Sequence, residues 1–231
     1  QTLFNITDTF FAGKISPEAL AALAKAFPLY FIIISAGIGI VAGCNSLISN
    51  SYGARNKVVA LIYSHNALTY AFLLSIIITI FGIYFSFDIL RLMESSYENT
   101  ILAKEYIDII FLGTIIFLIL TSFNSILYAQ GDTKTYRNVL IVGLIFNIIL
   151  NPIFIFGLFF IPAFGIAGLA ISTLLIQFVA CLYLYLKVIK SDLKITLKLS
   201  NFFIRKNFFI NIINQCMPIT FALFLVSGGS Y

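Results

Sequence analysis

The sequence predicts an all-α, polytopic membrane helix bundle, and three observations support this fold class. The 231-residue chain is 61% hydrophobic and only 10% charged, and its mean hydropathy is +1.04. Residues 138–186 contain no Asp, Glu, Lys, Arg or His. That length fits two helices, since about 20 residues cross a hydrocarbon core of roughly 30 Å. Several more charge-free windows alternate with short charged segments, so further spans are expected.

Seven helical segments are expected along the chain. The first is partial, because the apolar stretch around Asp8 is too short to cross a bilayer, so the sequence is expected to begin partway through a helix. The second has a clear start, since Ser16 can cap a helix and Pro17 suits its first position. The expected segments are residues 1–12, 17–49, 58–87, 107–128, 139–160, 165–186 and 208–231.

The loop charges predict the orientation in the membrane. Ten of the fourteen basic residues follow the second, fourth and sixth helices, within residues 55–57, 134–137 and 187–206. Basic loops remain in the cytoplasm, so the first span is expected to run outwards through the inner (plasma) membrane. Residues 187–206 are expected to be a basic cytoplasmic linker, either solvated or lying on the anionic inner leaflet through residues such as Leu193 and Ile195.

Asp8 is the first candidate functional residue. An Asp at the centre of a membrane helix costs about 2.5 to 3.5 kcal/mol on insertion scales, and such residues usually face a cavity on an ion or proton path. The alternative is an interfacial residue that caps a short helix beside Thr7 and Thr9.

The fifth expected span carries a second polar cluster. Asn147 and Asn151 are four residues apart and share one helix face. Pro152 lacks an N–H and frees the Ile148 carbonyl, so three oxygens could converge on a hard cation there. The alternative is a kinked helix whose Asn pair only bonds neighbouring helices.

Other functional classes find little support. No nucleophile elbow, HExxH motif, phosphate-binding loop or Cys/His metal spacing is present, so neither an enzyme nor a cofactor is expected. Asp8 with His65 is the only candidate catalytic pair for an intramembrane enzyme. The net charge of +5 is explained by membrane orientation, so no nucleic-acid partner is expected.

Six patterns in chain order resemble one family, the multidrug and toxic compound extrusion (MATE) transporters. Their joint occurrence covers nearly the whole chain and is more specific than any one of them. They are TDTFFAG (7–13), ALAA (19–22), SNSYGA (49–54), AQGDTK (129–134), NIILNPIFIFG (147–157) and GIAGLAIST (165–173).

The resemblance implies an antiporter that exports drugs or toxic organic compounds in exchange for protons or sodium ions, with two six-helix lobes around a central cavity. Residues 1–186 would form the amino-terminal lobe with an incomplete first helix, 187–206 the inter-lobe linker and 207–231 the start of the second lobe. The implied partners are an organic substrate, the bilayer and a second lobe of the same polypeptide. The sequence is then expected to be truncated, or to be an incomplete gene product.

The resemblance also implies site residues. Asp8 matches the first-span acid that couples to the ion, Asn147 matches a fifth-span Asn, and Thr173 a sixth-span Thr. Asn151 also falls at this site but is a departure, since many relatives carry Asp there, which leaves one carboxylate.

Three more residues, Gln1, Tyr106 and Asn124, fall where relatives line the cavity of the amino-terminal lobe.

A lipid-linked oligosaccharide flippase of the same broad superfamily is the alternative function. It is less expected, because every Lys and Arg lies outside the charge-free windows.

Overall fold

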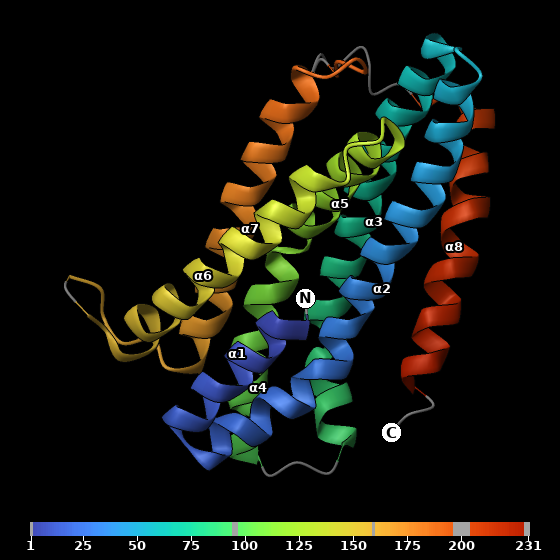
Figure 1. The fold of residues 1–231 in the computed structure, drawn as a ribbon. Coiled ribbons are helices and arrows are strands. Elements are labelled where there is room, and N and C mark those ends of the chain that lie inside the picture. The colour runs from blue at the N-terminus through green and yellow to red at the C-terminus, as the bar shows by residue number, and fades with distance from the viewer. Residues whose placement is uncertain (1, 94–96, 159, 196–203, 229–231) are drawn as a thin grey trace.

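The computed structural model describes residues 2–93, 97–158, 160–195 and 204–228, and each secondary-structure element in these ranges is an α-helix. Five helices are long and apolar enough to cross a membrane, and the bent pair α4 and α5 makes a sixth. The all-α membrane bundle is therefore confirmed (Figure 1). The helices are α1 (Thr2–Ile15), α2 (Pro17–Gly53), α3 (Lys57–Leu92), α4 (Tyr97–Leu112), α5 (Thr114–Ala129), α6 (Lys134–Phe156), α7 (Ile166–Ile189) and α8 (Lys206–Gly228).

The junction of α1 and α2 follows the predicted capping. Ser16 is in extended conformation with φ −168°, and its Oγ accepts a hydrogen bond of 3.1 Å from the Ala19 N–H. Pro17 occupies the start of α2, where a missing N–H costs nothing. The cap separates the short α1 from the long α2 and thereby sets the position of Asp8 within α1.

The fourth predicted span is not one straight helix. The predicted segment 107–128 straddles Gly113, where α4 and α5 meet at an angle of 46°. Thr79 Oγ1 of α3 donates a hydrogen bond of 2.7 Å to the Phe111 carbonyl, beside the break. A Cβ atom at Gly113 would lie 2.0 Å from Leu174 Cδ2, so glycine also lets α7 approach. Both causes are tertiary contacts, which local sequence does not reveal.

The fifth predicted span ends earlier than expected. The prediction was residues 139–160, but α6 stops at Phe156, and Gly157 adopts the left-handed φ of 71° that ends many helices. The chain then folds back, and the N–H groups of Phe164 and Gly165 bond the Phe154 and Ile155 carbonyls at 3.0 and 3.2 Å. This turn brings the start of α7 against the end of α6, close to Asn151.

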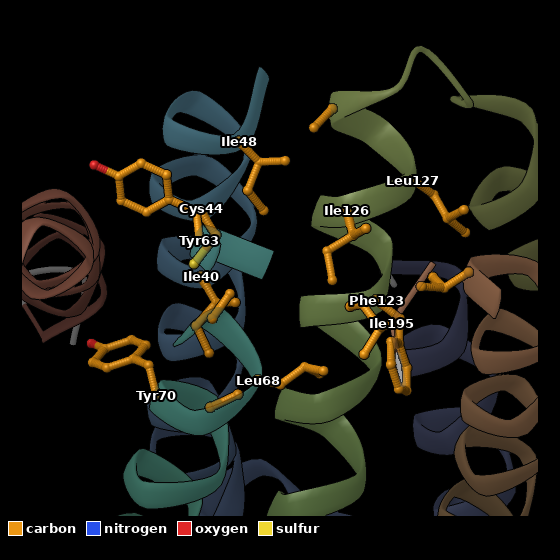
Figure 2. Close-up of a cluster of buried hydrophobic side chains, with 14 of the residues drawn as sticks. Ile40, Cys44, Ile48, Tyr63, Leu68, Tyr70, Phe123, Ile126, Leu127 and Ile195 are labelled. Atoms are coloured by element: carbon orange, nitrogen blue, oxygen red, sulfur yellow. The ribbon is translucent and has the colours of Figure 1, made fainter. Parts of the chain in front are cut away.

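The beginning of the linker is part of the hydrophobic core. Leu193 and Ile195 are buried in a cluster with side chains of α2, α3, α5 and α8, and Figure 2 shows Ile195 with Phe123 and Leu68 in this cluster. Neither expectation for these two side chains, solvent or the leaflet surface, was right. Residues 196–203 of the predicted linker lie outside the described residues.

Polar bonds fix the same segment to the helix ends. The Leu193 N–H donates to Gln130 Oε1 at 3.1 Å, and Asp192 accepts 2.7 Å and 3.3 Å bonds from Tyr52 and Lys57. The hydrogen bond from Tyr52 and, next, that from Lys57 stabilise the charged carboxylate and hold the pKa of Asp192 below its usual value. The start of the linker is thus attached to the end of α2, the start of α3 and the end of α5.

The ends of the bundle agree with the predicted division of loops. The loops after α2, α5 and α7 lie toward the same end in Figure 1, and these are the loops that carry most of the basic residues. Helix α8 packs against α2 and α3, on the far side of the bundle from α6 and α7 in Figure 1.

We expect the Gly168→Ala substitution to destabilise the bundle. A Cβ atom at Gly168 would lie 2.6 Å from the Phe154 carbonyl oxygen, and backbone cannot move aside as a flexible side chain can. Overpacking of this kind costs about 1–3 kcal/mol. The thermal unfolding midpoint of the purified protein in detergent measures it. Gly53→Ala is the control, since nothing lies within 4 Å of its added Cβ; equal midpoints for the two variants would contradict the close contact.

Candidate functional site

Asp8 is a buried acid held by a neighbouring helix. Its side chain is 5% exposed, and it lies in the middle of α1 rather than at its end, so the capping alternative is wrong. Asn147 Nδ2 and Asn151 Nδ2 of α6 donate to Asp8 Oδ1 at 3.1 and 2.9 Å. A buried carboxylate needs such partners, because burying an unpaired charge is very costly.

The two amides are themselves fixed. Asn151 Oδ1 accepts a short hydrogen bond from the Ser172 hydroxyl of α7, and Asn151 Nδ2 also lies 3.3 Å from Asn147 Oδ1. Both Asn side chains are fully buried. The cluster therefore joins α1, α6 and α7 through one carboxylate, two amides and one hydroxyl.

The amides present nitrogen, not oxygen, to the carboxylate. The expected convergence of three oxygens on a cation is therefore not the arrangement found. Asn147 and Asn151 do share one face of α6 as predicted, whereas Ile148 between them is half exposed on another face. The pair also bonds neighbouring helices, as the structural alternative proposed, but one partner is the candidate functional acid.

Thr173 and two tyrosines surround the acid. The Thr173 hydroxyl lies within electrostatic reach of Asp8, but its buried Oγ1 forms no hydrogen bond with the described residues. Tyr106, a predicted cavity residue, and Tyr30 of α2 are buried and also interact electrostatically with Asp8. Four helices besides α1 thus contribute to the surroundings of Asp8.

The structure does not join the other candidate residues, Asn124, Gln1 and His65, to the Asp8 cluster through any described contact. Asn124 of α5 is buried, with Oδ1 unbonded by the described residues, and no described contact joins it to Asp8. Gln1 lies outside the described residues. His65 Nδ1 lies 2.8 Å from the Leu61 carbonyl oxygen of its own helix, whereas Asp8 is bonded by α6, so the geometry gives no support to an Asp8–His65 catalytic pair.

Sequence reasoning missed Ser172 and Tyr30. Ser172 lies within the GIAGLAIST pattern (165–173) and is given no role by the sequence, yet its hydroxyl sets the orientation of Asn151. Its position next to Thr173 was the available signal. Tyr30 lies in an apolar stretch of α2, and nothing in the local sequence separates it from the other tyrosines.

We expect Asn151→Leu to destabilise the folded protein. It leaves Asp8 with one amide donor and the Ser172 hydroxyl without its acceptor, and an unsatisfied buried polar group costs about 1–3 kcal/mol, more when charged. The thermal midpoint in detergent measures the change. Asn138→Leu on the same helix is the control, because Asn138 is exposed.

A double-mutant cycle isolates the interaction. If Asp8 and Asn151 are coupled as the distances indicate, Asp8→Asn and Asn151→Leu together should deviate from additivity by about 0.5–3 kcal/mol. Additive effects of the two substitutions would refute the coupling.

Several known proteins are similar to this chain in sequence. The MatE family model matches residues 1–153. The chain is 37% identical over 159 residues to the probable multidrug resistance protein YoeA of Bacillus subtilis, covering 68% of this chain and 34% of that protein. It is 32% identical over 188 residues to a FAD transporter of Shewanella oneidensis, covering 81% of this chain and 42% of that protein. The chain thus spans less than half the length of these relatives.

Solved structures of MATE transporters have the same fold as this chain. A multidrug resistance MATE family transporter in its inward-facing conformation superposes with a TM-score of 0.88 at 30% identity, over 98% of this chain and 51% of that one. An outward-facing conformation gives a TM-score of 0.86 at 30% identity, over 96% and 49%. These relatives are transporters rather than enzymes, and their names do not favour the flippase alternative. From the family model, the fold and the relatives together, the chain belongs to the MATE family of integral membrane transporters.

Proposed function

We propose that this chain is the amino-terminal lobe of an antiporter that exports organic compounds across the inner membrane, with Asp8 as the group that binds the coupling ion. The observation that carries the proposal is one buried carboxylate held by two amides of another helix. Asp8 is the single buried charged side chain among the described residues, and charged residues in membrane interiors usually serve ion or proton paths.

The arrangement favours a proton over a sodium ion. Hard cations need several oxygen ligands, but both amides turn N–H groups toward Asp8 Oδ1. To bind sodium with their oxygens, both amides would have to rotate and Asn151 would lose its bond from Ser172. A proton needs no such change. It can bind Asp8 Oδ2, because both amide bonds go to the other carboxyl oxygen, Oδ1.

Protonation would alter the contact between α1 and α6. In the charged state the two amide bonds to Asp8 are charge-assisted, and such bonds are roughly twice as strong as neutral ones. A proton on Oδ2 removes the charge and weakens the attachment of α1 to α6. If the inward-facing and outward-facing states differ in their affinity for this proton, proton binding shifts the equilibrium toward the state that binds it more tightly. The size of the shift is set by the difference between the two affinities.

The lobe itself is proposed to change little during transport. Its superposition is nearly the same on inward-facing and outward-facing relatives, with TM-scores of 0.88 and 0.86. Alternating access in many transporters is a rocking of one bundle against another. We infer that the major movement is between this lobe and a second lobe of the same polypeptide, with the change at α1 as the local trigger.

Substitution of Asp8 by Asn in the two-lobe transporter tests the proposal. Asp8→Asn keeps the size of the side chain and removes its charge, so we expect efflux driven by a pH gradient in proteoliposomes to fall to background while membrane insertion is unchanged. Asp88→Asn, an exposed acid of α3, is the control and should keep efflux. Normal efflux by Asp8→Asn would refute the role of Asp8, and efflux of the unsubstituted protein by a sodium gradient at constant pH would refute proton coupling.

The substrate is expected to be neutral or cationic. The described interior offers one acidic and no basic side chain, which suits a cation or a neutral aromatic compound better than a polyanion such as FAD. Competition between an organic cation, ethidium, and FAD for export by the same proteoliposomes tests this. We expect ethidium to be exported and FAD to be neither exported nor inhibitory; export of FAD would overturn the expectation.

A further inference from the structure

A lateral groove lies between α6 and α7, apart from the Asp8 cluster. It has a volume of about 540 Å³ and runs from near the ends of these helices at the basic loops to beyond their middle. Its walls are exposed apolar side chains, among them Val142, Phe146 and Val179, which are 51%, 51% and 59% exposed. Its floor includes the buried residues Gly143 and Ala180.

The dimensions of the groove match one leaflet. The lining residues of α6 extend from Asn138 to Leu150, which is about 18 Å at 1.5 Å per residue. Half of a hydrocarbon core of roughly 30 Å is about 15 Å. The groove therefore has about the length of the acyl region of one leaflet. It begins next to the basic loops and extends past the middle of α6 and of α7.

The mouth of the groove is basic. Its two lining residues nearest the loops are Asn138 and Tyr183. Arg137 Nη2 donates to Asn138 Oδ1 at 3.3 Å, and Lys187 Nζ lies 5.6 Å from the centroid of the Tyr183 ring. Both cations are exposed, and the ion pairs found among the described residues involve other side chains.

One acid lies near this mouth. Asp132 interacts electrostatically with Lys187, but its carboxylate is bonded by the Thr135 N–H at 3.0 Å and hydroxyl at 2.6 Å. Arg137 and Lys187 together outweigh it, and no acid lines the groove itself. The mouth thus offers two cationic groups and two neutral polar groups above an apolar channel.

We propose that this groove binds one anionic phospholipid of the cytoplasmic leaflet, with an acyl chain along α6 and α7 and the phosphate between Arg137 and Lys187. Basic residues at the membrane surface attract anionic lipids, and the apolar channel accepts the chain. Helix α8, where the second lobe would begin, lies on the far side of the bundle from α6 and α7 in Figure 1, so it does not cover the groove.

The absence of Trp from the chain makes a direct test possible. A single Trp is placed in the groove, as Val142→Trp or Val179→Trp, in the two-lobe protein with any Trp of the second lobe replaced by Phe. Ile145→Trp, also on α6 and 54% exposed but outside the groove lining, is the matched control. Vesicles of phosphatidylcholine contain a minority of phosphatidylglycerol with brominated acyl chains, which quench Trp fluorescence on contact.

We expect the groove Trp to report a preference for the brominated anionic lipid over phosphatidylcholine of about thirtyfold, since each of the two basic residues near the surface supplies about fivefold. The Ile145 Trp should report the bulk fraction. Arg137→Gln with Lys187→Gln should abolish the enrichment, whereas Arg55→Gln, an exposed cation of another loop, should not.

Four outcomes would overturn the proposal. Equal quenching at Val142 and Ile145 would show that the groove holds no particular lipid. Enrichment of brominated phosphatidylcholine to the same extent would show a site for an acyl chain without headgroup recognition. Displacement of the lipid by inorganic phosphate would assign the site to a free anion, and displacement by ethidium would assign it to the exported compound.

Discussion

The attachment of Asp8 to Asn147 and Asn151 is the interaction on which the arrangement of this lobe depends. A carboxylate inside a membrane bundle is tolerated only with hydrogen-bond partners, and these partners come from a helix about 140 residues away in sequence. Satisfying this one charge sets the position of α1 against α6, and the bond from Ser172 extends the constraint to α7. The same bonds would respond first to a proton, so the stability of the contact and its proposed role in coupling have the same physical origin.

The rest of the lobe supports this cluster by close packing. Gly168 lets the start of α7 contact the backbone of α6 near Asn151, and Gly113 lets Leu174 approach the junction of α4 and α5. In a bilayer, helices associate by such packing and by interhelical hydrogen bonds, because lipid is as apolar as their side chains. A small movement at α1 would therefore pass to neighbouring helices through contacts that leave little free space.

The same helices present two different faces. The inner face of α6 carries Asn147 and Asn151, both fully buried, whereas its outer face carries Val142 and Phe146, both half exposed along the lateral groove. Gly143 forms part of the groove floor, and a Cβ atom there would lie 3.1 Å from the ring of Phe4, one turn before Asp8. A lipid in the groove would therefore contact the wall that supports the acid, so the lipid environment and the proposed coupling site share a helix.

The sequence by itself determined the all-α membrane fold and the order of the spans, and it singled out Asp8 and the Asn pair as candidate residues, because hydropathy, charge and helical spacing are local properties. Tertiary structure decided what depends on contacts between distant segments. It turned the amide nitrogens rather than the oxygens toward Asp8, recruited Ser172 and Tyr30, and bent the fourth span at Gly113 through Thr79 and Leu174. It also buried Leu193 and Ile195 of the linker in the core. The physical reason is the same in each case: a helical pattern shows which face is polar or apolar, but the partner that meets the face is chosen by packing.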